Sequence, residues 1–452
     1  MKNIINMVYL KDYKYFVKTY GCQANEYDSE LIASILEKLG AEAVDNESDA
    51  DIVVFNTCAV RKNAENKFYG RLGALKKIKN EKKDMIVIVA GCLAQKDYLK
   101  ISSIDHVDVV LGTHRISALP QILQEIKYSR KKIVDVDFTG RTEPDVPARR
   151  LSKFSAYIPI MFGCDYYCTF CIVPFTRGKM QSRSREEILK EVKNLDEKGY
   201  KEIIYLGQTV NAYGIDNKFQ YDFADLLEET VSLVKNIRWI RFTSPYPTNF
   251  NQKQIEVISK YSKIAKHIHL PLQSGNNEIL RKMARRYTVE QFLDVISQFR
   301  EKNEYIGLST DIIVGFPTET EEQFYDTLSV VEKVRFDQAF MFAYSEREGT
   351  KAANYQGAIP YRERLKRLYK LIEVQNKITE EKNREYVGKI VEILVEGSTD
   401  KNPLMWEGRT ETNKIVVFNK PNKDISGKFA KVKINNSFLW GLEGELIEVE
   451  SD

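Results

Sequence analysis

The stretch that decides the fold and the chemistry of this chain is GCDYYCTFC, residues 163–171, which places Cys164, Cys168 and Cys171 on one short loop. Three thiolates at this spacing can bind three irons of a 4Fe-4S cluster, and no fourth cysteine lies nearby for the remaining iron. The spacing therefore predicts a cluster with one open iron. The alternative is a structural zinc loop or three unrelated buried thiols. A zinc site would need a fourth Cys or His close by, and the four histidines are distant in sequence.

The composition is that of an ordinary globular protein of two or three domains, with 452 residues and a net charge of +4. This charge permits nucleic-acid binding without arguing for it. Six cysteines in such a length are sparse, and clustered cysteines of this kind are typical of metal or catalytic use in a reducing compartment. The start, 1–14, is too polar to enter a bilayer. We expect a cytoplasmic protein with no membrane partner.

The other cysteines, Cys22, Cys58 and Cys92, each follow a β-branched or aromatic run that predicts a buried strand. The predicted strands are 15–21, 52–57, 86–91 and 107–111, and the helical patterns are 29–39, 64–78, a short one from about 94, and 117–127. This alternation predicts an open parallel α/β domain, whose ligands bind beyond the carboxyl ends of the strands. The thiols therefore converge and can hold a second cluster with an open iron. The alternative is three small buried residues in tight loops.

After a Pro- and Arg-rich linker at 142–150, a longer series of strands and helices begins. The predicted strands are 155–160, 202–206, 239–242, 267–270, 307–314 and 338–343, with helices such as 185–198, 276–283 and 320–334 between them. Six parallel strands predict an open or partial α/β barrel with its functional face at the carboxyl ends, and the cysteine loop follows the first strand. The segments GQTVN (207–211), PLQSG (271–275) and GFPTE (315–319) follow later strands. Each alone is an ordinary turn, but together they predict a ligand site.

The carboxyl-terminal part begins with a charged helix at 361–386, whose apolar positions Leu365, Leu368, Leu371 and Ile372 are expected to pack on the barrel. Short alternating strands follow at 389–395, 413–418, 429–434 and 443–449. They predict a small β-barrel of the oligonucleotide-binding kind, or else a capping barrel without a ligand.

Two basic groups are candidates for contacts with RNA phosphates, although a charge run is more often a solvated face. One group follows the cluster loop and the other lies further along the barrel: Arg177, Lys179, Arg183 and Arg185, then Arg281, Lys282, Arg285 and Arg286. A splayed base in an RNA loop is a plausible target of such a protein.

The loop Cys164 to Cys171 resembles the signature of the radical S-adenosylmethionine superfamily. The resemblance implies that the open iron binds the methionyl amino and carboxylate groups of the cofactor, and that reductive cleavage yields a 5′-deoxyadenosyl radical. It places Phe170 near the adenine and Gly207 and Gln208 near the methionyl amine, where the family often has Glu instead of Gln. Gln273, Ser274 and Gly315 are further cofactor-binding candidates on the segments that follow strands.

Over nearly all of residues 12–448 the chain resembles the methylthiotransferases, on the motifs NTCAVR (56–61), CIVPFTRG (171–178) and PLQSG (271–275). The resemblance implies three domains: 12–140 with an auxiliary 4Fe-4S cluster on Cys22, Cys58 and Cys92, 150–382 with the radical cluster, and 384–450 as a TRAM RNA-binding domain. The segment GRTETNK (408–414) and the apolar residues that follow look like the MiaB-type tRNA enzymes rather than the RimO type, which modifies a ribosomal protein.

The implied activity is methylthiolation of C2 of N6-isopentenyladenosine next to the tRNA anticodon, with two S-adenosylmethionine molecules and two clusters. One cofactor molecule methylates the sulfur and the second supplies the radical. The expected partners are the anticodon stem-loop and an electron donor, with a sulfur donor as a further candidate. Alternatives are the same reaction on N6-threonylcarbamoyladenosine, or a non-enzymatic iron-sulfur protein that binds RNA and senses redox state. No catalytic residue is assigned beyond the clusters.

Overall fold

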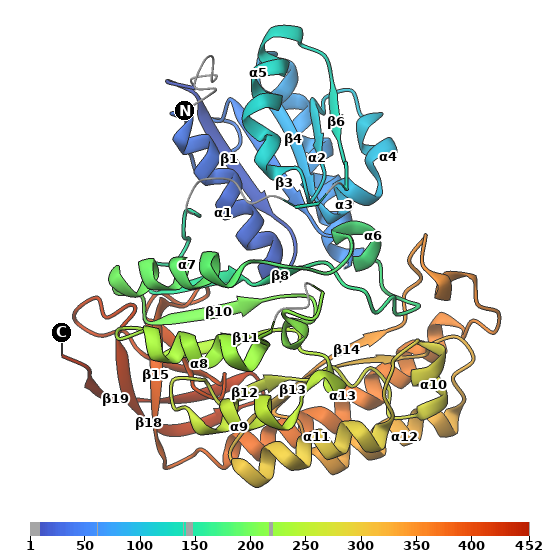
Figure 1. Cartoon of the computed structure of the whole chain (residues 1–452), viewed down its shortest axis with the longest axis vertical. Coiled ribbons are helices and arrows are strands. Elements are labelled where there is room, and N and C mark those ends of the chain that lie inside the picture. Colours follow the sequence, from blue (N-terminus) through green and yellow to red (C-terminus); the bar gives the residue numbers. More distant parts are fainter. Residues whose placement is uncertain (1–9, 61, 139, 142–147, 217–219, 452) are drawn as a thin grey trace. The chain divides into compact units, whose positions relative to one another are not determined.

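The structure is a computed structural model that describes residues 10–60, 62–138, 140–141, 148–216 and 220–451. Arg61 of the NTCAVR motif and positions 142–147 of the predicted linker lie outside the described residues. The chain divides into two compact units. The first unit is Met1–Leu151 with Phe162–Asp165 and Cys171–Met180, and the second is Ser152–Met161, Tyr166–Phe170 and Gln181–Asp452 (Figure 1). The predicted boundaries 12–140, 150–382 and 384–450 stay a prediction.

The first unit is an α/β sandwich around a six-stranded sheet with the order β2-β1-β3-β4-β5-β6, in which all pairs are parallel. Its elements are β1 (Lys14–Thr19), α1 (Gln23–Lys38), β2 (Glu42–Ala43), β3 (Ile52–Thr57), α2 (Lys62–Glu81), β4 (Ile86–Gly91), α3 (Cys92–Lys96), α4 (Tyr98–Ser102), β5 (Val109–Leu111), the 3-10 helix η1 (Ile116–Ala118), α5 (Leu119–Ser129), β6 (Ile133–Asp135) and α6 (Val173–Arg177). The central strands β3 and β4 are buried along their whole length. Burial on both faces of a parallel sheet explains why their sequences are largely apolar without alternation. The predicted parallel domain is confirmed.

Helices cover both faces of this sheet. Phe68 and Leu72 of α2 pack with Phe55 and Val89 on one face, where α3 and α4 also lie, and α1 and α5 cover the other face (Figure 1). Helix α1 begins six residues earlier than the predicted 29–39 helix, because its first turns bury polar residues such as Asn25 and Asp28 instead of apolar ones. The short strands β2 and β6 were not predicted from the sequence.

The second unit contains the predicted barrel. Its elements up to the long helix are β7 (Ser155–Pro159), β9 (Gln181–Ser182), α7 (Arg185–Glu197), β10 (Glu202–Leu206), η2 (Val210–Ala212), α8 (Phe223–Leu233), β11 (Trp239–Phe242), η3 (Pro247–Asn249), α9 (Gln252–Lys260), β12 (His267–His269), α10 (Asn277–Lys282), α11 (Val289–Lys302), β13 (Gly307–Val314), α12 (Glu321–Val334), β14 (Gln338–Ala343), η4 (Lys351–Asn354) and α13 (Tyr361–Arg384), while β8 (Met161–Phe162) spans the boundary of the two units. Helices α11 and α12 start at the capping boxes of Thr288 and Thr320, which fixes the ends of two barrel loops.

The six barrel strands follow one another in chain order, as predicted. They form two parallel sheets of three strands, β11-β10-β7 and β12-β13-β14. A single parallel bridge between Ile240 and Ile264 links them. Ile264 precedes β12, which runs only from His267 to His269. The open α/β barrel itself is confirmed.

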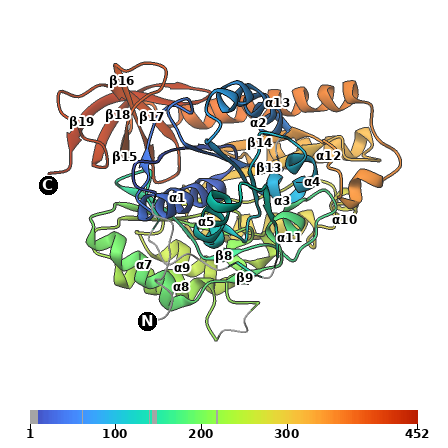
Figure 2. The same cartoon turned by 90° about the horizontal axis from the view of Figure 1, so that it is seen from above.

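The carboxyl-terminal part is a closed five-stranded barrel of order β15-β16-β17-β19-β18. Its strands are β15 (Ile390–Ser398), β16 (Met405–Thr410), β17 (Ile415–Asn419), β18 (Phe429–Phe438) and β19 (Gly441–Val449), and Val416, Phe418, Val432 and Ile434 fill its interior. The predicted small barrel is confirmed, with β16 as the strand not assigned from sequence. Figure 2 shows α13 running from this barrel past β14. Among the described residues, no helix combines the length and the apolarity needed to cross a membrane.

One buried ion cluster joins the parts of the second unit. The Asp337 carboxylate, just before β14, pairs with Lys382 Nζ of α13 at 2.9 Å and with Lys414 Nζ of the small barrel at 3.1 Å. The Asp337 and Lys414 side chains are each 8% exposed. The Leu308 amide also donates to Asp337 Oδ2 at 3.0 Å. Burial by itself raises the pKa of Asp337, but Lys414 and Lys382 outweigh it and hold that pKa below its ordinary value.

We expect Asp337→Ala to lower the free energy of unfolding of the second unit by about 3–5 kcal/mol at pH 7, because it leaves a buried ammonium without its partner. All three tryptophans, at 239, 406 and 440, lie in this unit, so urea denaturation followed by their fluorescence measures the effect. The control is Glu448→Ala, which removes an exposed ion pair with Lys431 and should change little.

The ion pairs of Asp337 also make the free energy of unfolding depend on pH. Because the pKa of Asp337 is lower in the folded than in the unfolded chain, its stabilisation is complete above the unfolded value of about 3.9 and disappears as the pH falls through the folded value. The stability gap between wild type and Asp337→Ala should therefore narrow in acid. A gap that widens on acidification would contradict this account.

Candidate functional site: two thiol triplets

The first thiol triplet consists of Cys22, Cys58 and Cys92. It lies at the carboxyl ends of the neighbouring strands β1, β3 and β4, as predicted. Cys22 is exposed, whereas Cys58 and Cys92 are buried. Burial raises the pKa of the Cys92 thiol to about 11; Arg177 opposes this rise and the Cys22 and Cys58 thiols add to it. The sulfurs are therefore close enough to interact electrostatically, and the sheet topology has brought together residues that are more than thirty positions apart.

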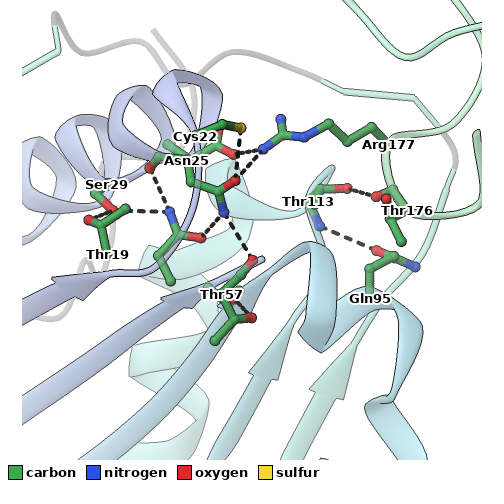
Figure 3. Close-up of polar contacts among 12 residues, drawn as sticks. Thr19, Cys22, Asn25, Ser29, Thr57, Gln95, Thr113, Thr176 and Arg177 are labelled. Atoms are coloured by element: carbon green, nitrogen blue, oxygen red, sulfur yellow. Dashed lines mark hydrogen bonds and ion pairs between the residues drawn. The ribbon is translucent and has the colours of Figure 1, made fainter. Parts of the chain in front are cut away.

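A buried hydrogen-bond network holds the loops that carry these cysteines. Asn25 Nδ2 donates to Asn56 Oδ1 and to the Thr57 carbonyl, both at 3.0 Å, and Asn56 Nδ2 donates to Ser29 Oγ at 3.0 Å. The Cys22 thiol contacts Asn25 Oδ1 at 3.5 Å (Figure 3). Asn25 thus ties the first cysteine loop to the second. Sequence reasoning missed this residue, because an Asn three positions after a Cys carries no distinctive signal.

Gly91, directly before Cys92, is required by this network. Its φ is +93°, and a Cβ there would lie 2.3 Å from Asn56 Oδ1 and 2.6 Å from the Thr57 carbonyl oxygen. Any side chain would push the β3 and β4 loops apart. The backbone at Gly91 therefore sets the approach of Cys92 to the other two cysteines.

Arg177 is not a surface contact for RNA, which corrects its assignment from sequence. Its side chain is 5% exposed, and its Nη2 donates to Asp28 Oδ2 at 2.9 Å and to Asn25 Oδ1 at 3.4 Å (Figure 3). The cause is the docking of the segment after Cys171, where Ile172 packs against Ala59 and Cys92. Although burial alone lowers the pKa of Arg177, the Cys92 thiol and Asp28 raise it above its ordinary value. Its charge faces the first thiol triplet.

The second triplet lies on the loop after β8. Cys164 and Cys171 belong to the first unit and Cys168 to the second. Gly163 begins the loop with a φ of +68°, where a Cβ would be 2.0 Å from the Lys179 carbonyl oxygen, and the Cys164 amide donates to the Gly178 carbonyl at 3.1 Å. The start of the loop is thus closed against the segment 178–179, and only glycine fits at its first position.

Within the second unit, Cys168 is buried and faces a guanidinium. Arg285 Nη1 donates to Cys168 Sγ at 3.4 Å and its Nε donates to Tyr287 Oη at 3.1 Å. The guanidinium also lies over the Tyr246 ring, 4.4 Å from its centroid. The role of Arg285 as a phosphate contact, inferred from the sequence, stays a prediction. The partner lies 117 residues away, so no local pattern could reveal it.

Two of the predicted cofactor residues have acceptor atoms that no protein group satisfies. Gln208 Oε1 and Gln273 Oε1 are buried, and neither has a hydrogen-bond partner among the described residues. Phe170 packs against the apolar cluster that contains Met283 and Phe316. Such unpaired acceptors near strand ends fit a ligand that brings N–H donors.

The other predicted cofactor residues have structural neighbours. Ser274 is fully buried, with its hydroxyl 3.5 Å from that of Thr327, and the Gly315 amide donates to Glu319 Oε2 at 2.7 Å. Gly207 lies against Met161, since a Cβ there would be 2.7 Å from Met161 Cγ. Their role in cofactor binding stays a prediction.

The remaining basic candidates fall into two kinds. Arg183 pairs with Glu191 at 2.9 Å, and Arg185 pairs with Glu229. The exposed residues are Lys179, Arg281 and Arg286, and Arg286 lies over the Tyr166 ring at 5.4 Å. We therefore weight these three exposed residues most heavily as phosphate contacts.

The donor set fits iron-sulfur clusters better than single metal ions. Within the described ranges, no three His, Cys, Asp or Glu side chains are gathered as one metal ion requires. A 4Fe-4S cluster instead takes each thiolate on a different iron, whereas a zinc site would need a fourth ligand. Each triplet also has a guanidinium at its sulfurs, Arg177 at the first and Arg285 at the second, which suits an anionic cluster.

An open α/β barrel with a Cys-x3-Cys-x2-Cys loop after its first strand defines the radical S-adenosylmethionine class of protein. The sequence model of that superfamily matches residues 158–331, that of the TRAM domain matches 384–447, and that of the uncharacterized protein family UPF0004 matches 14–112. The chain belongs to the tRNA-2-methylthio-N(6)-dimethylallyladenosine synthase family. It is 45% identical over 443 residues to the synthase of Bacillus cytotoxicus, covering 97% of this chain and 86% of that protein. With the synthase of Halalkalibacterium halodurans the identity is 43% over 441 residues, 96% of this chain and 81% of that protein.

Solved structures show the same fold at low identity. The radical S-adenosylmethionine methyltransferase TsrM from Kitasatospora setae, with cobalamin and a 4Fe-4S cluster bound, has a TM-score of 0.55 at 13% identity, over 75% of this chain and 77% of that chain. The cobalamin-dependent S-adenosylmethionine radical enzyme OxsB has a TM-score of 0.53 at 16% identity, over 80% and 57% of the two chains. These likenesses support the architecture of the chain alone.

If Cys168 ligates a 4Fe-4S cluster, as the sequence predicts, we expect Arg285→Gln to lower the midpoint potential of that cluster by an amount on the order of 60 mV, because a charged donor to the sulfur is lost. Potentiometric titration of the reconstituted protein measures this shift. The matched control is Arg286→Gln, whose guanidinium lies over Tyr166 instead. Equal potentials for wild type and Arg285→Gln would show that Arg285 has no electrostatic effect on the cluster.

Proposed function

We propose that this enzyme adds a methylthio group to C2 of N6-isopentenyladenosine next to the anticodon of tRNA. The chain is a radical S-adenosylmethionine enzyme that modifies tRNA, and its cofactors are 4Fe-4S clusters and S-adenosylmethionine. The observation that carries the proposal is that all six cysteines fall into two triplets, in a chain related along 97% of its length to a synthase of this name.

The two triplets have different proposed roles. Cys164, Cys168 and Cys171 hold the cluster that binds S-adenosylmethionine, and Cys22, Cys58 and Cys92 hold the auxiliary cluster. The clusters and the cofactor supply the radical chemistry that an aromatic C–H bond requires, since acid–base side chains cannot activate such a bond.

The protein groups around the second triplet bind and orient the cofactor in this proposal. The unpaired Gln208 and Gln273 carbonyl oxygens accept hydrogen bonds from the methionyl ammonium group. Phe170 offers its ring to the adenine, while Gly207, Ser274 and Gly315 shape the neighbouring backbone. Arg177 and Arg285 offset part of the negative charge that each set of thiolates brings.

The substrate side of the proposal rests on the exposed basic residues and the small barrel. Lys179, Arg281 and Arg286 contact phosphates of the anticodon stem-loop, and the TRAM domain supplies a further RNA surface. An electron donor is a necessary partner, a sulfur donor is a candidate, and we place the enzyme in the cytoplasm on its cysteine usage.

The direct test combines the reconstituted full-length protein, a reductant, S-adenosylmethionine and an anticodon stem-loop that carries isopentenyladenosine. Mass spectrometry of the nucleosides should show the methylthio product. A parallel reaction with threonylcarbamoyladenosine in the same RNA should show none. Lack of product on the first RNA, with both clusters confirmed by iron and sulfide analysis, would refute the proposal.

Two cysteine variants separate the roles of the triplets. Cys168→Ala should abolish 5′-deoxyadenosine formation while about half of the bound iron remains. Cys92→Ala should lose a similar share of iron and all methylthio product, yet still cleave S-adenosylmethionine. A non-enzymatic redox sensor predicts instead that even the wild-type protein binds RNA without forming 5′-deoxyadenosine.

A further inference from the structure

One face of the sheet β12-β13-β14 carries side chains to which the proposed function gives no role, although Ile313 on this face packs in the same apolar cluster as Phe170. Alternate residues of β13 point to opposite faces, and Leu308, Thr310, Ile312 and Val314 are fully buried. The other face carries Ser309, Asp311 and Ile313, of which the last two are partly exposed. This face therefore combines a carboxylate with accessible surface in the middle of a barrel strand.

Two aromatic rings stand beside this carboxylate. The parallel register places Phe340 opposite Asp311 and Phe342 opposite Ile313, so these residues share one face of the sheet. Phe340 is 41% exposed and Phe342 is 42% exposed. They lie on β14, the edge strand of this sheet, and adjacent exposed apolar side chains of this size often mark a binding surface. Their exposure indicates a surface that a flat apolar ligand can cover.

The Asp311 carboxylate is held by a chain of hydrogen bonds across the sheet. His269 Nε2 lies 3.1 Å from Asp311 Oδ2, His269 Nδ1 lies 2.9 Å from Ser309 Oγ, and Ser309 Oγ lies 3.0 Å from His267 Nε2. Burial, aided by the nearby positive charge of Arg241, lowers the pKa of His267 to about 3, so that ring is neutral.

The direction of the last hydrogen bond follows from the donors and acceptors available. An ionised carboxylate only accepts, so His269 donates to Asp311 through Nε2, while Ser309 Oγ bridges His269 Nδ1 and His267 Nε2. Each group is thereby oriented by the next. Asp311 Oδ2 is fixed at the end of the chain, beside Phe340, whose ring centroid is 5.8 Å from that of His269.

A fixed carboxylate next to exposed aromatic rings suits a nucleobase rather than a phosphate. Aromatic side chains stack on the faces of unpaired bases, and a carboxylate accepts a hydrogen bond from an exocyclic amine while repelling phosphate groups. In adenine, N6–H and C2 lie on either side of N1. A base that is held through N6–H at a fixed point therefore has its C2 at a defined position.

We propose that Asp311, positioned by His269 and flanked by Phe340 and Phe342, determines specificity for the target base of the RNA by accepting a hydrogen bond from its N6–H. The proposal rests on the proposed function, because it assumes an RNA adenine as the substrate. The isopentenyl derivative retains one N6–H, so the contact is available in the modified base. A carbonyl at position 6, as in inosine, would meet the carboxylate with a second acceptor.

The test compares two anticodon stem-loops that differ only at the target position, adenosine in one and inosine in the other. Fluorescence anisotropy with the full-length holoenzyme gives a Kd for each. Wild type should prefer the adenosine RNA, and Asp311→Asn should reduce the ratio of the two Kd values about 10-fold, because its amide can donate to O6. The control variant Asp294→Asn, on the exposed side of α11, should leave the ratio unchanged.

A second variant keeps the proposal testable if Asp311→Asn fails to fold. Phe340→Ala replaces an exposed side chain and should weaken the binding of both RNAs by about 10-fold without changing their ratio, since stacking does not distinguish the two bases. Unchanged binding of both RNAs by Phe340→Ala would overturn the proposal, as would an unaltered Kd ratio for folded Asp311→Asn.

Two further measurements separate this inference from its alternatives. If Asp311→Asn raises the KM for S-adenosylmethionine in RNA-free cleavage and leaves the Kd ratio unaltered, the site serves the adenine of the cofactor and the proposal is wrong. If the wild-type enzyme makes no methylthio product on isopentenylated RNA, the proposed function fails. If it makes the product while both variants bind RNA as wild type does, only the present inference fails.

Discussion

The first unit depends on one buried carboxylate, Asp28, which lies between two guanidinium groups. Asp28 Oδ1 pairs with Arg141 Nη1 at 2.7 Å and Asp28 Oδ2 pairs with Arg177 Nη2 at 2.9 Å. All three side chains are 5% exposed or less. Without Asp28, two positive charges would be buried side by side without compensation. With it, α1, α6 and the residue Arg141 are joined, and one surplus positive charge is directed at the Cys22 and Cys92 thiols.

The segment from Cys171 to Arg177 contributes to both triplets. The chain that leaves Cys171 places Ile172 on Cys92 and then, as α6, delivers Arg177 to the first triplet. In the second unit, Arg285 donates a hydrogen bond to the Cys168 sulfur in a comparable way. In both places, a guanidinium lies beside a buried cysteine, Cys92 or Cys168, where it would stabilise the negative charge of a metal-binding thiolate. Burial still raises the pKa of the Cys92 thiol, so Arg177 offsets this effect only in part.

The barrel contains two kinds of buried or partly buried polar group, which differ in whether protein groups complete their hydrogen bonds. Gln208 and Gln273 keep buried acceptors without protein partners, which suits a ligand that enters with its own donors. Asp311, in contrast, is already oriented by His269, Ser309 and His267. In the two proposals, the first set binds the cofactor and the second set binds the target base, so the barrel would hold two molecules at once.

The sequence by itself determined the cysteine triplets, the parallel strands and the small barrel, because each is encoded in local spacing or in short periodic patterns. It did not reveal the start of α1, where Asn25 and Asp28 are buried, since polar residues in a first turn resemble a solvated helix end. Only the tertiary structure placed Arg177 and Arg285 beside cysteines, because a guanidinium looks the same in sequence whether it contacts phosphate or sulfur. Their partners lie 149 and 117 residues away along the chain, and contacts at such separations follow from packing rather than from any local pattern.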